Sequence, residues 1–195
     1  MIYRIIGASK EDADVIAEGI MTAIGEEICT DLAGGKENLP MVRRLFRELA
    51  EKETSQYSYL NTLKAVDENG AIAGVIVAYD GADLHTLRQN FVDKYNELFN
   101  ATLSESDFDD ETSPDEIYID TLMVGSAYRR QGIASMLIDE LGKKYAGCGK
   151  ALGLLVDYTN PNARKLYAKS GFESKGMRKF CGVEMEHMQK ALRNE

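Results

Sequence analysis

The segment Arg129-Arg130-Gln131-Gly132-Ile133-Ala134 has the residue types of a phosphate-binding turn. It follows an apolar run, residues 117–124, and precedes a pattern typical of an amphipathic helix. The N-terminus of a helix offers unpaired N–H donors and the positive end of its dipole to an anion. Gly132 lets a ligand approach the backbone because it has no Cβ, and the two guanidiniums suit phosphate oxygens. The turn therefore predicts an anion site, to which Ser135 adds a hydroxyl donor.

A second block of interest begins about thirty residues further on, with Asn160-Pro161-Asn162-Ala163 and then Leu166-Tyr167 and Gly171-Phe172. Asn160 is typical of a helix cap and Pro161 of a first helical position. Leu166, Tyr167 and Phe172, which follow, could be core residues with no part in a binding site. A nucleotide phosphate loop is excluded, because its glycine-lysine-serine/threonine core is absent, and so is the three-glycine dinucleotide fingerprint.

Together the two blocks resemble the GNAT superfamily of acyl-CoA-dependent N-acetyltransferases, most strongly over residues 117–172. The resemblance implies an α/β (α+β) fold whose mixed, mostly antiparallel twisted sheet is flanked by helices. In that fold the two central strands splay apart and coenzyme A lies in the opening. By position, the splayed strands here would be residues 117–124 and 151–158.

The resemblance also implies roles for individual residues. The pyrophosphate would lie on the backbone N–H groups of Gln131, Gly132, Ile133 and Ala134, beside Arg129, Arg130 and Ser135. The family pattern places Asn160 and Ala163 at the coenzyme arm. Unpaired N–H groups of the splayed strand, at Leu122, Met123 and Val124, are candidates to hold the thioester carbonyl oxygen.

Two side chains are candidates for proton transfer. The family pattern points Tyr167 toward the coenzyme sulfur, where a phenol can protonate the departing thiolate. Asp120 is our first choice as the base, because a carboxylate inside an apolar strand is costly unless it is paired or useful. The alternative is a structural acid bonded to backbone or to a tyrosine. If the base lies elsewhere, Glu26, Glu27 and Asp80 are next.

The other reactive residue types carry no prediction of catalysis. We expect His85 and His187 to be structural or exposed, and Cys148, in a Gly-Cys-Gly turn, to be incidental. The three cysteines show no metal spacing, and their odd number favours reduced thiols. We therefore predict no metal site.

The expected activity is the transfer of an acetyl group from acetyl-CoA directly to an amine of a small molecule or protein. One alternative is a non-enzymatic acyl-CoA-binding sensor on the same fold. A second is an interaction domain with a vestigial pocket, against which the intact arginine–glycine turn argues. The acceptor pocket should come from the two N-terminal helices and residues 79–100, but no pattern there identifies the acceptor.

Composition limits the remaining possibilities. A chain of 195 residues with 44% hydrophobic and 28% charged residues fits one globular domain, residues 1–195. The net charge of −9 argues against nucleic-acid binding and favours cationic amines. We find no signal peptide and no apolar run long enough to cross a membrane, so we expect a cytoplasmic protein with no membrane partner. A homodimer is also considered.

The surrounding patterns predict the elements that position these residues. Strands are expected at residues 2–6, at 60–66 and 71–79 as a hairpin, at 151–156, and at 172–180 and 183–190 as a final pair. Helices are expected at residues 10–29, from Asn38 and Pro40 onward, at 82–100, after the arginine–glycine turn, and from Pro161 to Gly171. The acidic segment 104–116 is interpreted as a mobile, solvated loop, with a lid or an amine-attracting rim as the alternative.

Overall fold

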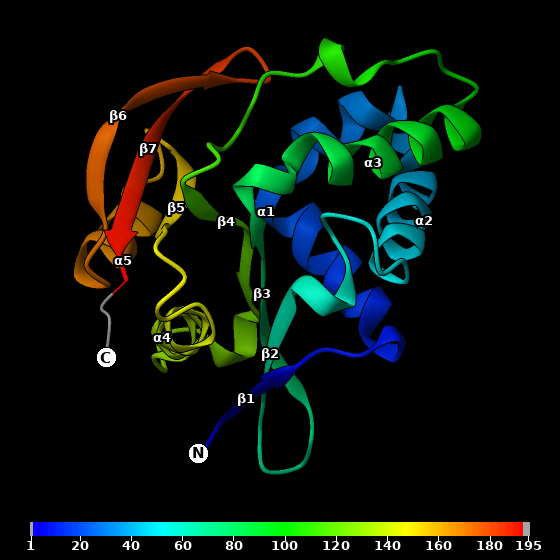
Figure 1. Ribbon diagram of the computed structural model, residues 1–195. Helices are drawn as coiled ribbons and strands as arrows, with labels where there is room; N and C mark the ends of the chain where they lie inside the picture. The colour runs from blue at the N-terminus through cyan, green and yellow to red at the C-terminus, as the bar shows by residue number, and fades with distance from the viewer. Residues whose placement is uncertain (1, 193–195) are drawn as a thin grey trace.

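The computed structural model describes residues 2–192, which fold around one mixed sheet of seven strands (Figure 1). The strands are β1 Arg4–Gly7, β2 Thr62–Val66, β3 Ile72–Asp80, β4 Glu116–Val124, β5 Ala151–Asp157, β6 Glu173–Phe180 and β7 Val183–Ala191. Their order in the sheet is β1-β2-β3-β4-β5-β7-β6, and every pair is antiparallel except β4–β5. The predicted mostly antiparallel sheet is confirmed, and β7 lies between β5 and β6.

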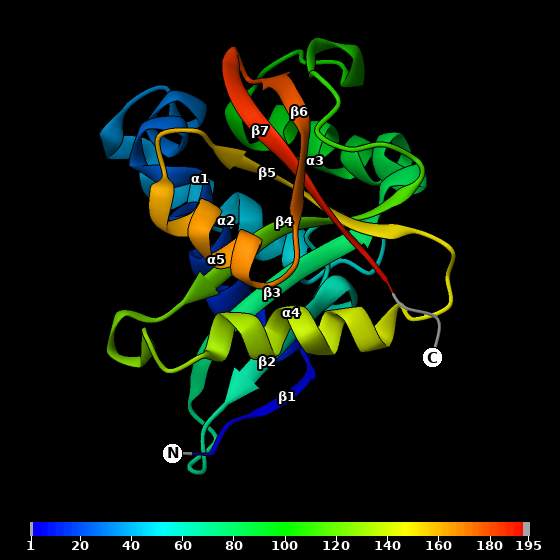
Figure 2. The same ribbon diagram turned by 90° about the vertical axis from the view of Figure 1, so that its left-hand side faces the viewer.

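Helices cover both faces of the sheet (Figures 1 and 2). The helices are α1 Ala13–Ala33, α2 Leu39–Ala50, α3 Leu84–Phe99, α4 Ile133–Lys144 and α5 Pro161–Lys169. Apolar residues of α1, α2 and α3 form one core cluster with Val77 of β3. Ile133, Leu137, Ile138 and Leu141 of α4 pack on the opposite face, which α5 also contacts. Burial of these apolar faces holds the layers together.

Helix α1 differs from the continuous helix predicted over residues 10–29. It is preceded by a short 3-10 turn, and it extends to Ala33. At Gly25 the backbone leaves the helical region, with φ 86° and ψ 164°. Only glycine adopts such angles readily, so the helix is broken into two segments that point in different directions. The second segment contributes Ile28 and Leu32 to the wall of a cavity described below.

Strands β2 and β3 form the predicted hairpin around Asp67-Glu68-Asn69-Gly70. The Asp67 carboxylate accepts hydrogen bonds from the backbone N–H groups of Asn69 and Ala71, each at 2.9 Å. This arrangement closes the turn and fixes the pairing of the two strands. Strand β3 lies between β2 and β4 and is almost completely buried, as its apolar run predicted.

The parallel pair β4–β5 is joined at one end only. Residues 116–118 of β4 pair with residues 151–153 of β5, and no pairing is present between the later residues of these strands. Figure 2 shows the two strands diverging from their shared end. The predicted splay between the two central strands is therefore present, and it leaves backbone groups of both strands free to contact a ligand.

A buried carboxylate holds the closed end of this opening together. Glu116, fully buried, accepts hydrogen bonds from Thr112 Oγ1, His187 Nε2 and Gln189 Nε2, each at 2.8 Å. Burial raises the pKa of this carboxyl, but the hydrogen bonds from His187, Gln189 and Thr112 outweigh burial and lower the pKa below its ordinary value. Because His187 and Gln189 belong to β7, Glu116 connects β4 to β7 across β5. His187 was expected to be structural or exposed, and the structure shows that it is buried and has a structural contact.

This connection needs a residue without a side chain at position 153 of β5. A Cβ on Gly153 would lie 2.0 Å from Glu116 Oε2, so the carboxylate would have to move away from its partners. We expect Gly153→Ala to lower the free energy of unfolding by on the order of 3 kcal/mol, measured by chemical denaturation.

Gly7→Ala in strand β1 is the matched control, since a Cβ there meets nothing within 4 Å. It should change the free energy of unfolding by less than about 0.5 kcal/mol. Equal effects of the two substitutions would show that the Glu116 hydrogen bonds contribute little to stability.

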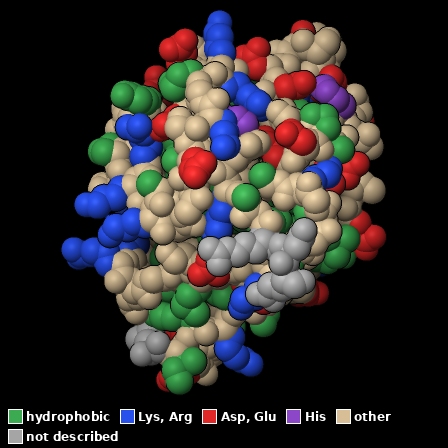
Figure 3. Space-filling view, turned by 60° about the vertical axis from the view of Figure 1, so that its left-hand side comes forward, with side chains coloured by type: hydrophobic (Ala, Val, Ile, Leu, Met, Phe, Trp, Pro, Cys, Tyr) green, Lys and Arg blue, Asp and Glu red, His purple; other side chains and the backbone are tan. Residues whose placement is uncertain are grey.

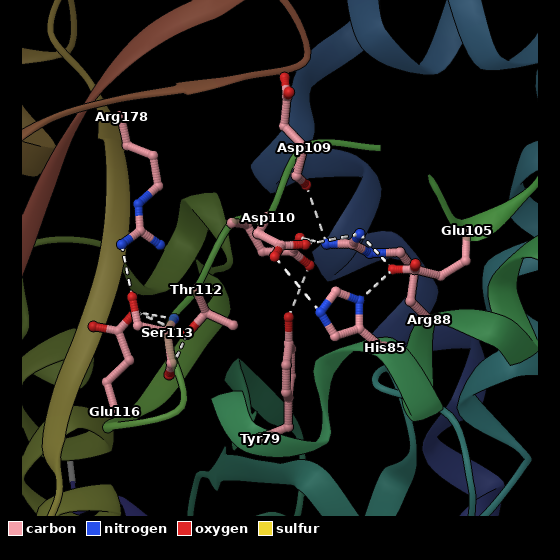
Figure 4. Close-up of polar contacts among 11 residues, drawn as sticks. Tyr79, His85, Arg88, Glu105, Asp109, Asp110, Thr112, Ser113, Glu116 and Arg178 are labelled. Atoms are coloured by element: carbon pink, nitrogen blue, oxygen red, sulfur yellow. Dashed lines mark hydrogen bonds and ion pairs between the residues drawn. The ribbon is translucent and has the colours of Figure 1, made fainter. Parts of the chain in front are cut away.

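The acidic segment 104–116 is only in part the solvated loop that its composition predicted: several of its residues are exposed, but Glu111, Thr112 and Glu116 are buried (Figure 4). The buried guanidinium of Arg88 in α3 binds Glu105 at 2.8 Å, Asp110 at 3.3 Å and the carboxylate of Glu111. Tyr79 donates a second hydrogen bond to Glu111, at 2.8 Å. A buried guanidinium requires such partners, and the acids supply them. The part of the segment from Glu105 to Glu111 is therefore held against α3 by ion pairs.

His85, Glu105 and Asp110 place nitrogen and oxygen atoms within 4.8 Å of one another, as a metal site would require. Arg88 already binds both carboxylates, and His85 Nδ1 lies 2.6 Å from Glu105 (Figure 4). These contacts already engage the side chains of the cluster, so we interpret it as a network of ion pairs.

Charge is distributed unevenly over the surface. On the face drawn in Figure 3, Lys and Arg side chains gather at the left edge, whereas Asp and Glu lie mainly toward the top and right. Within residues 2–192, no helix combines the length and apolar character that spanning a membrane would need.

Candidate active site

A cavity of about 580 Å³ occupies the opening between β4 and β5. Its walls are the diverging part of β4, the turn before α4, the end of β5 and the face of α5. The predicted site residues that line it are Asp120, Leu122, Met123, Val124, Arg129, Arg130, Gly132, Ile133, Ala134, Ser135, Asn160, Ala163 and Tyr167. The structure thus brings together residues that are far apart in the sequence, and Gln131 alone of the predicted set is not among the lining residues.

Asp120 lies at an irregularity in the pairing of β3 with β4. Val77 pairs with Thr121 and Ala78 pairs with Ile119, so Asp120 is an extra residue opposite no partner. Such a bulge changes which face later residues of a strand present. Ile119 and Leu122 consequently both contact the core on the α4 face, and Asp120 borders the cavity. The sequence placed Asp120 in the strand, but only the pairing reveals the bulge.

The surroundings of Asp120 suit a proton acceptor that works near neutral pH. Burial and the nearby charge of Glu111 raise its pKa to about 7, against smaller opposing effects of hydrogen bonds from Thr121 and Gln56. The Thr121 hydroxyl donates to the carboxylate at 2.9 Å. These contacts orient the carboxylate without neutralising it, which is typical of a general base.

The opened edge of β4 carries polar groups that the sheet leaves unused. Gly125 N–H donates to Ala73 of β3 at 2.9 Å, so by alternation Met123 also faces β3 while Leu122 and Val124 face the opening. The Val124 carbonyl accepts a hydrogen bond from Arg129 Nε at 3.3 Å. Of the three residues predicted to hold an oxyanion, the N–H groups of Leu122 and Val124 have the suitable direction, and Met123 is a lining residue whose N–H faces β3.

The arginine–glycine turn has a backbone shape that few residues adopt. Arg130 has a φ of 61° and Gly132 a φ of 81°, both in the left-handed region. Gly132 caps α4, whose first helical hydrogen bond runs from Met136 N–H to the Gly132 carbonyl at 3.1 Å. The N–H groups of Ile133, Ala134 and Ser135 precede that bond, so the first turn of the helix offers them to an anion.

Gln131 does not turn its side chain into the cavity. Its Oε1 atom accepts a hydrogen bond from the Tyr3 hydroxyl at 2.8 Å, and its Nε2 atom donates to the Ala127 carbonyl at 3.3 Å. The side chain therefore connects the turn to the N-terminal part of the chain. A role in ligand binding would involve only its backbone N–H.

Helix α5 contributes Asn160 and Tyr167 to the opposite wall. Asn160 caps the helix as predicted, since its side-chain oxygen accepts a hydrogen bond from Ala163 N–H at 3.1 Å. The Tyr167 ring packs edge-on against Phe172, with 5.6 Å between the ring centres. Burial raises the pKa of Tyr167 to about 12, so the phenol keeps its proton at physiological pH. It can act as a hydrogen-bond or proton donor in the cavity.

The reserve candidates for the base lie elsewhere. Glu26 is exposed and pairs with Lys36 at 2.6 Å. Glu27 is exposed, and Asp80 binds Lys150. His85 is exposed within the Arg88 network, and Cys148 lies in an exposed turn. None of these residues is among those lining the cavity.

A second cavity of about 300 Å³ meets the first at Asp120. It lies between the second segment of α1, α3 and the turn that joins β6 to β7. Part of its wall comes from the N-terminal helices and residues 79–100, the region predicted for an acceptor pocket, and Phe108 and Glu111 of the acidic segment also line it, whereas no prediction named Gln56 or Phe180. These residues follow no periodic pattern, so only their proximity in space identifies them.

Comparison with known proteins agrees with this geometry. A model of the acetyltransferase (GNAT) family matches residues 26–172. The chain belongs to the GNAT acetyltransferase family. This membership makes the protein an enzyme of the acyltransferase class and assigns it acetyl transfer.

Solved structures extend the similarity over nearly the whole acetyltransferase. A crystal structure of an acetyltransferase is 32% identical, with 97% of this chain and 100% of that chain covered and a TM-score of 0.76. An N-acetyltransferase from Staphylococcus aureus Mu50 is 25% identical, with 95% and 99% covered and a TM-score of 0.72. A spermidine N-acetyltransferase chimera from Vibrio cholerae and a human enzyme is 12% identical, with 97% and 95% covered and a TM-score of 0.56, and shares the fold alone. None of the curated proteins matches this GNAT acetyltransferase.

Proposed function

We propose that this protein transfers the acetyl group of acetyl-CoA directly to an amine of a small molecule or protein. The observation that carries the proposal is the composition of one cavity. The arginine–glycine turn, the opened edge of β4, Asp120 and Tyr167 all border it. An anion site, oxyanion donors, a base and an acid are the groups that acyl transfer from a thioester to an amine requires.

The amine nitrogen attacks the thioester carbon after Asp120, directly or through a water molecule, accepts a proton from the ammonium. The N–H groups of Leu122 and Val124 stabilise the oxyanion of the tetrahedral intermediate. When the carbon–sulfur bond breaks, Tyr167 donates its proton to the departing thiolate, and the phenolate takes back the proton that the nitrogen of the intermediate loses as the neutral amide forms. The phosphates of the coenzyme are held by Arg129, Arg130 and the first turn of α4. No covalent enzyme intermediate is needed, because a thioester already reacts with a free amine.

The direct test is release of the coenzyme thiol from acetyl-CoA in the presence of a panel of primary amines, with the acetylated amine identified by mass spectrometry. Calorimetry with coenzyme A measures binding separately from turnover. We expect both binding and amine-dependent thiol release. Binding without turnover for every amine would favour the acyl-CoA sensor, and the absence of binding would refute both functions.

Tyr167→Phe tests the proposed acid. We expect this variant to bind coenzyme A as the wild type does and to turn over about a hundredfold more slowly, because the phenol matters when the thiolate leaves. Tyr145→Phe is the matched control, since Tyr145 lies at the end of α4 and is not a lining residue. If the Tyr167→Phe variant turned over at the wild-type rate, Tyr167 would not be the acid, and its role would be to pack against Phe172.

A further inference from the structure

The second cavity contains a buried polar atom that the protein leaves unsatisfied. Gln56, 3% exposed, borders this cavity, and its Oε1 atom has no hydrogen-bond partner among the described residues. The same side chain forms a hydrogen bond with Asp120. Burying an unpaired carbonyl oxygen is unfavourable, so a ligand that donates a hydrogen bond there would remove the penalty. This oxygen is thus an acceptor for an N–H group held beside Asp120.

Aromatic and aliphatic side chains together form most of the remaining wall. The aromatic residues that line the cavity are Phe46, Tyr57, Phe91, Phe108, Tyr118 and Phe180, and Ile28 and Val183 lie at exposed positions on its border. A volume of about 300 Å³ is at the small end of the range for ligand sites. The cavity therefore suits a compact apolar group, for which aromatic walls provide a large contact area.

The charges of the cavity disfavour a carboxylate on the ligand. The one guanidinium among its lining residues belongs to Arg88, which is already bound by Glu105, Asp110 and Glu111. Asp120 and Asp157 add acidic groups where the two cavities meet. A cationic ligand is attracted there, whereas the carboxylate of an amino acid would find repulsion and no free cation.

We infer that the acceptor is a primary amine with a compact apolar or aromatic body and no carboxylate. Its nitrogen lies between the Asp120 carboxylate and Gln56 Oε1, at the junction of the two cavities, and its body fills the aromatic cavity. This inference rests on the proposed function, because it assigns the acceptor of that reaction. A polyamine fits less well, because its further ammonium groups would lie against the mainly apolar wall, where the carboxylate of Glu111 is already bound by Arg88 and Tyr79.

Three amines distinguish these classes. We expect 2-phenylethylamine to give a kcat/KM at least about tenfold higher than phenylalanine, which adds a carboxylate to the same ring, or spermidine, which replaces the ring with further ammonium groups. A preference for phenylalanine or spermidine would overturn the inference.

Substitutions then test the location. Gln56→Met keeps the size of the side chain but removes its amide, and we expect it to raise the KM for 2-phenylethylamine about ten- to a hundredfold. Ile28→Lys places a like charge at the border, where Ile28 is 37% exposed, and should raise the KM about tenfold or more. Leu60→Lys is the matched control, because Leu60 is 51% exposed and lines neither cavity, and it should leave the KM close to that of the wild type. All variants should bind coenzyme A with wild-type affinity, which confirms folding.

Direct binding separates this inference from the proposed reaction. Calorimetric titration of 2-phenylethylamine into protein containing coenzyme A needs no turnover. Binding that is weakened by Gln56→Met and Ile28→Lys supports the inference even if acetyl transfer fails. Unchanged KM and binding in both variants, with 2-phenylethylamine turned over normally, would overturn the inference while leaving acetyl transfer intact.

Discussion

Replacing Asp120 with asparagine is expected to keep the fold and the affinity for coenzyme A but to reduce turnover near pH 7 by about a hundredfold or more. With a pKa of about 7, Asp120 is ionised in a substantial fraction of molecules at neutral pH. The wild-type rate should therefore rise with pH through this region. In the asparagine variant, raising the pH should recover part of the rate, because more of the acceptor amine is then already neutral.

Thermal unfolding provides the control for a purely structural role. The pKa of Asp120 is raised in the folded state, so between about pH 4 and 7 the folded chain holds a proton that the unfolded chain releases. This group stabilises the fold less as pH rises through that window. The Asp120→Asn variant has no carboxylate to ionise, so its stability does not fall for this reason as pH rises. It should therefore unfold at a higher temperature than the wild type at pH 8.

Asp139→Asn, on an exposed position of α4, is the matched substitution for rate and stability. An unfolded Asp120→Asn variant would show that Asp120 is structural. A pH–rate profile equal to that of the wild type would place the base elsewhere.

Gly132→Glu should abolish detectable binding of coenzyme A. The substitution places a carboxylate at the start of α4, where the unpaired N–H groups of the helix and Arg129 and Arg130 favour an anion. Its charge would repel the pyrophosphate and compete for the same donors. Calorimetry on the folded variant measures the effect.

Gly132→Asn is the appropriate control, because position 132 has a φ of 81° and asparagine tolerates left-handed angles better than most residues. The neutral variant should retain most of the affinity for coenzyme A. Wild-type affinity in a folded Gly132→Glu variant would exclude this turn as the phosphate site. Loss of binding in both variants would show that the shape of the turn matters more than its charge.

The sequence predicted those features that depend on local pattern. Apolar periodicity located the strands and helices, and the β2–β3 turn follows from Asp67 and Gly70 at the two ends of the four-residue segment 67–70. Helix α5 begins where Asn160 and Pro161 predicted. The arginine–glycine turn stands at the start of α4 as predicted, because a glycine with a positive φ both ends the preceding turn and caps the helix.

Features that depend on pairing between distant segments could not be predicted. The bulge at Asp120 exists only in the register of β4 against β3. The acidic segment looked solvated because its partner, the buried Arg88, lies in a different helix. The break at Gly25 was hidden by helical spacing that continues on both sides of it. Gln56 lies in a connection without periodicity, so its position in the wall of the second cavity had no signal in the sequence.

Glu116 and Gly153 form an epistatic pair. A side chain at position 153 is costly only while the Glu116 carboxylate passes over it. Loss of Glu116 removes that constraint but leaves His187 and Gln189 without their buried acceptor. The effects of substitutions at the two positions should therefore not add. If Glu116 were lost during evolution and a larger residue were then fixed at position 153, a single substitution that restored glutamate at position 116 would no longer be tolerated. The restored carboxylate would clash with the side chain at position 153.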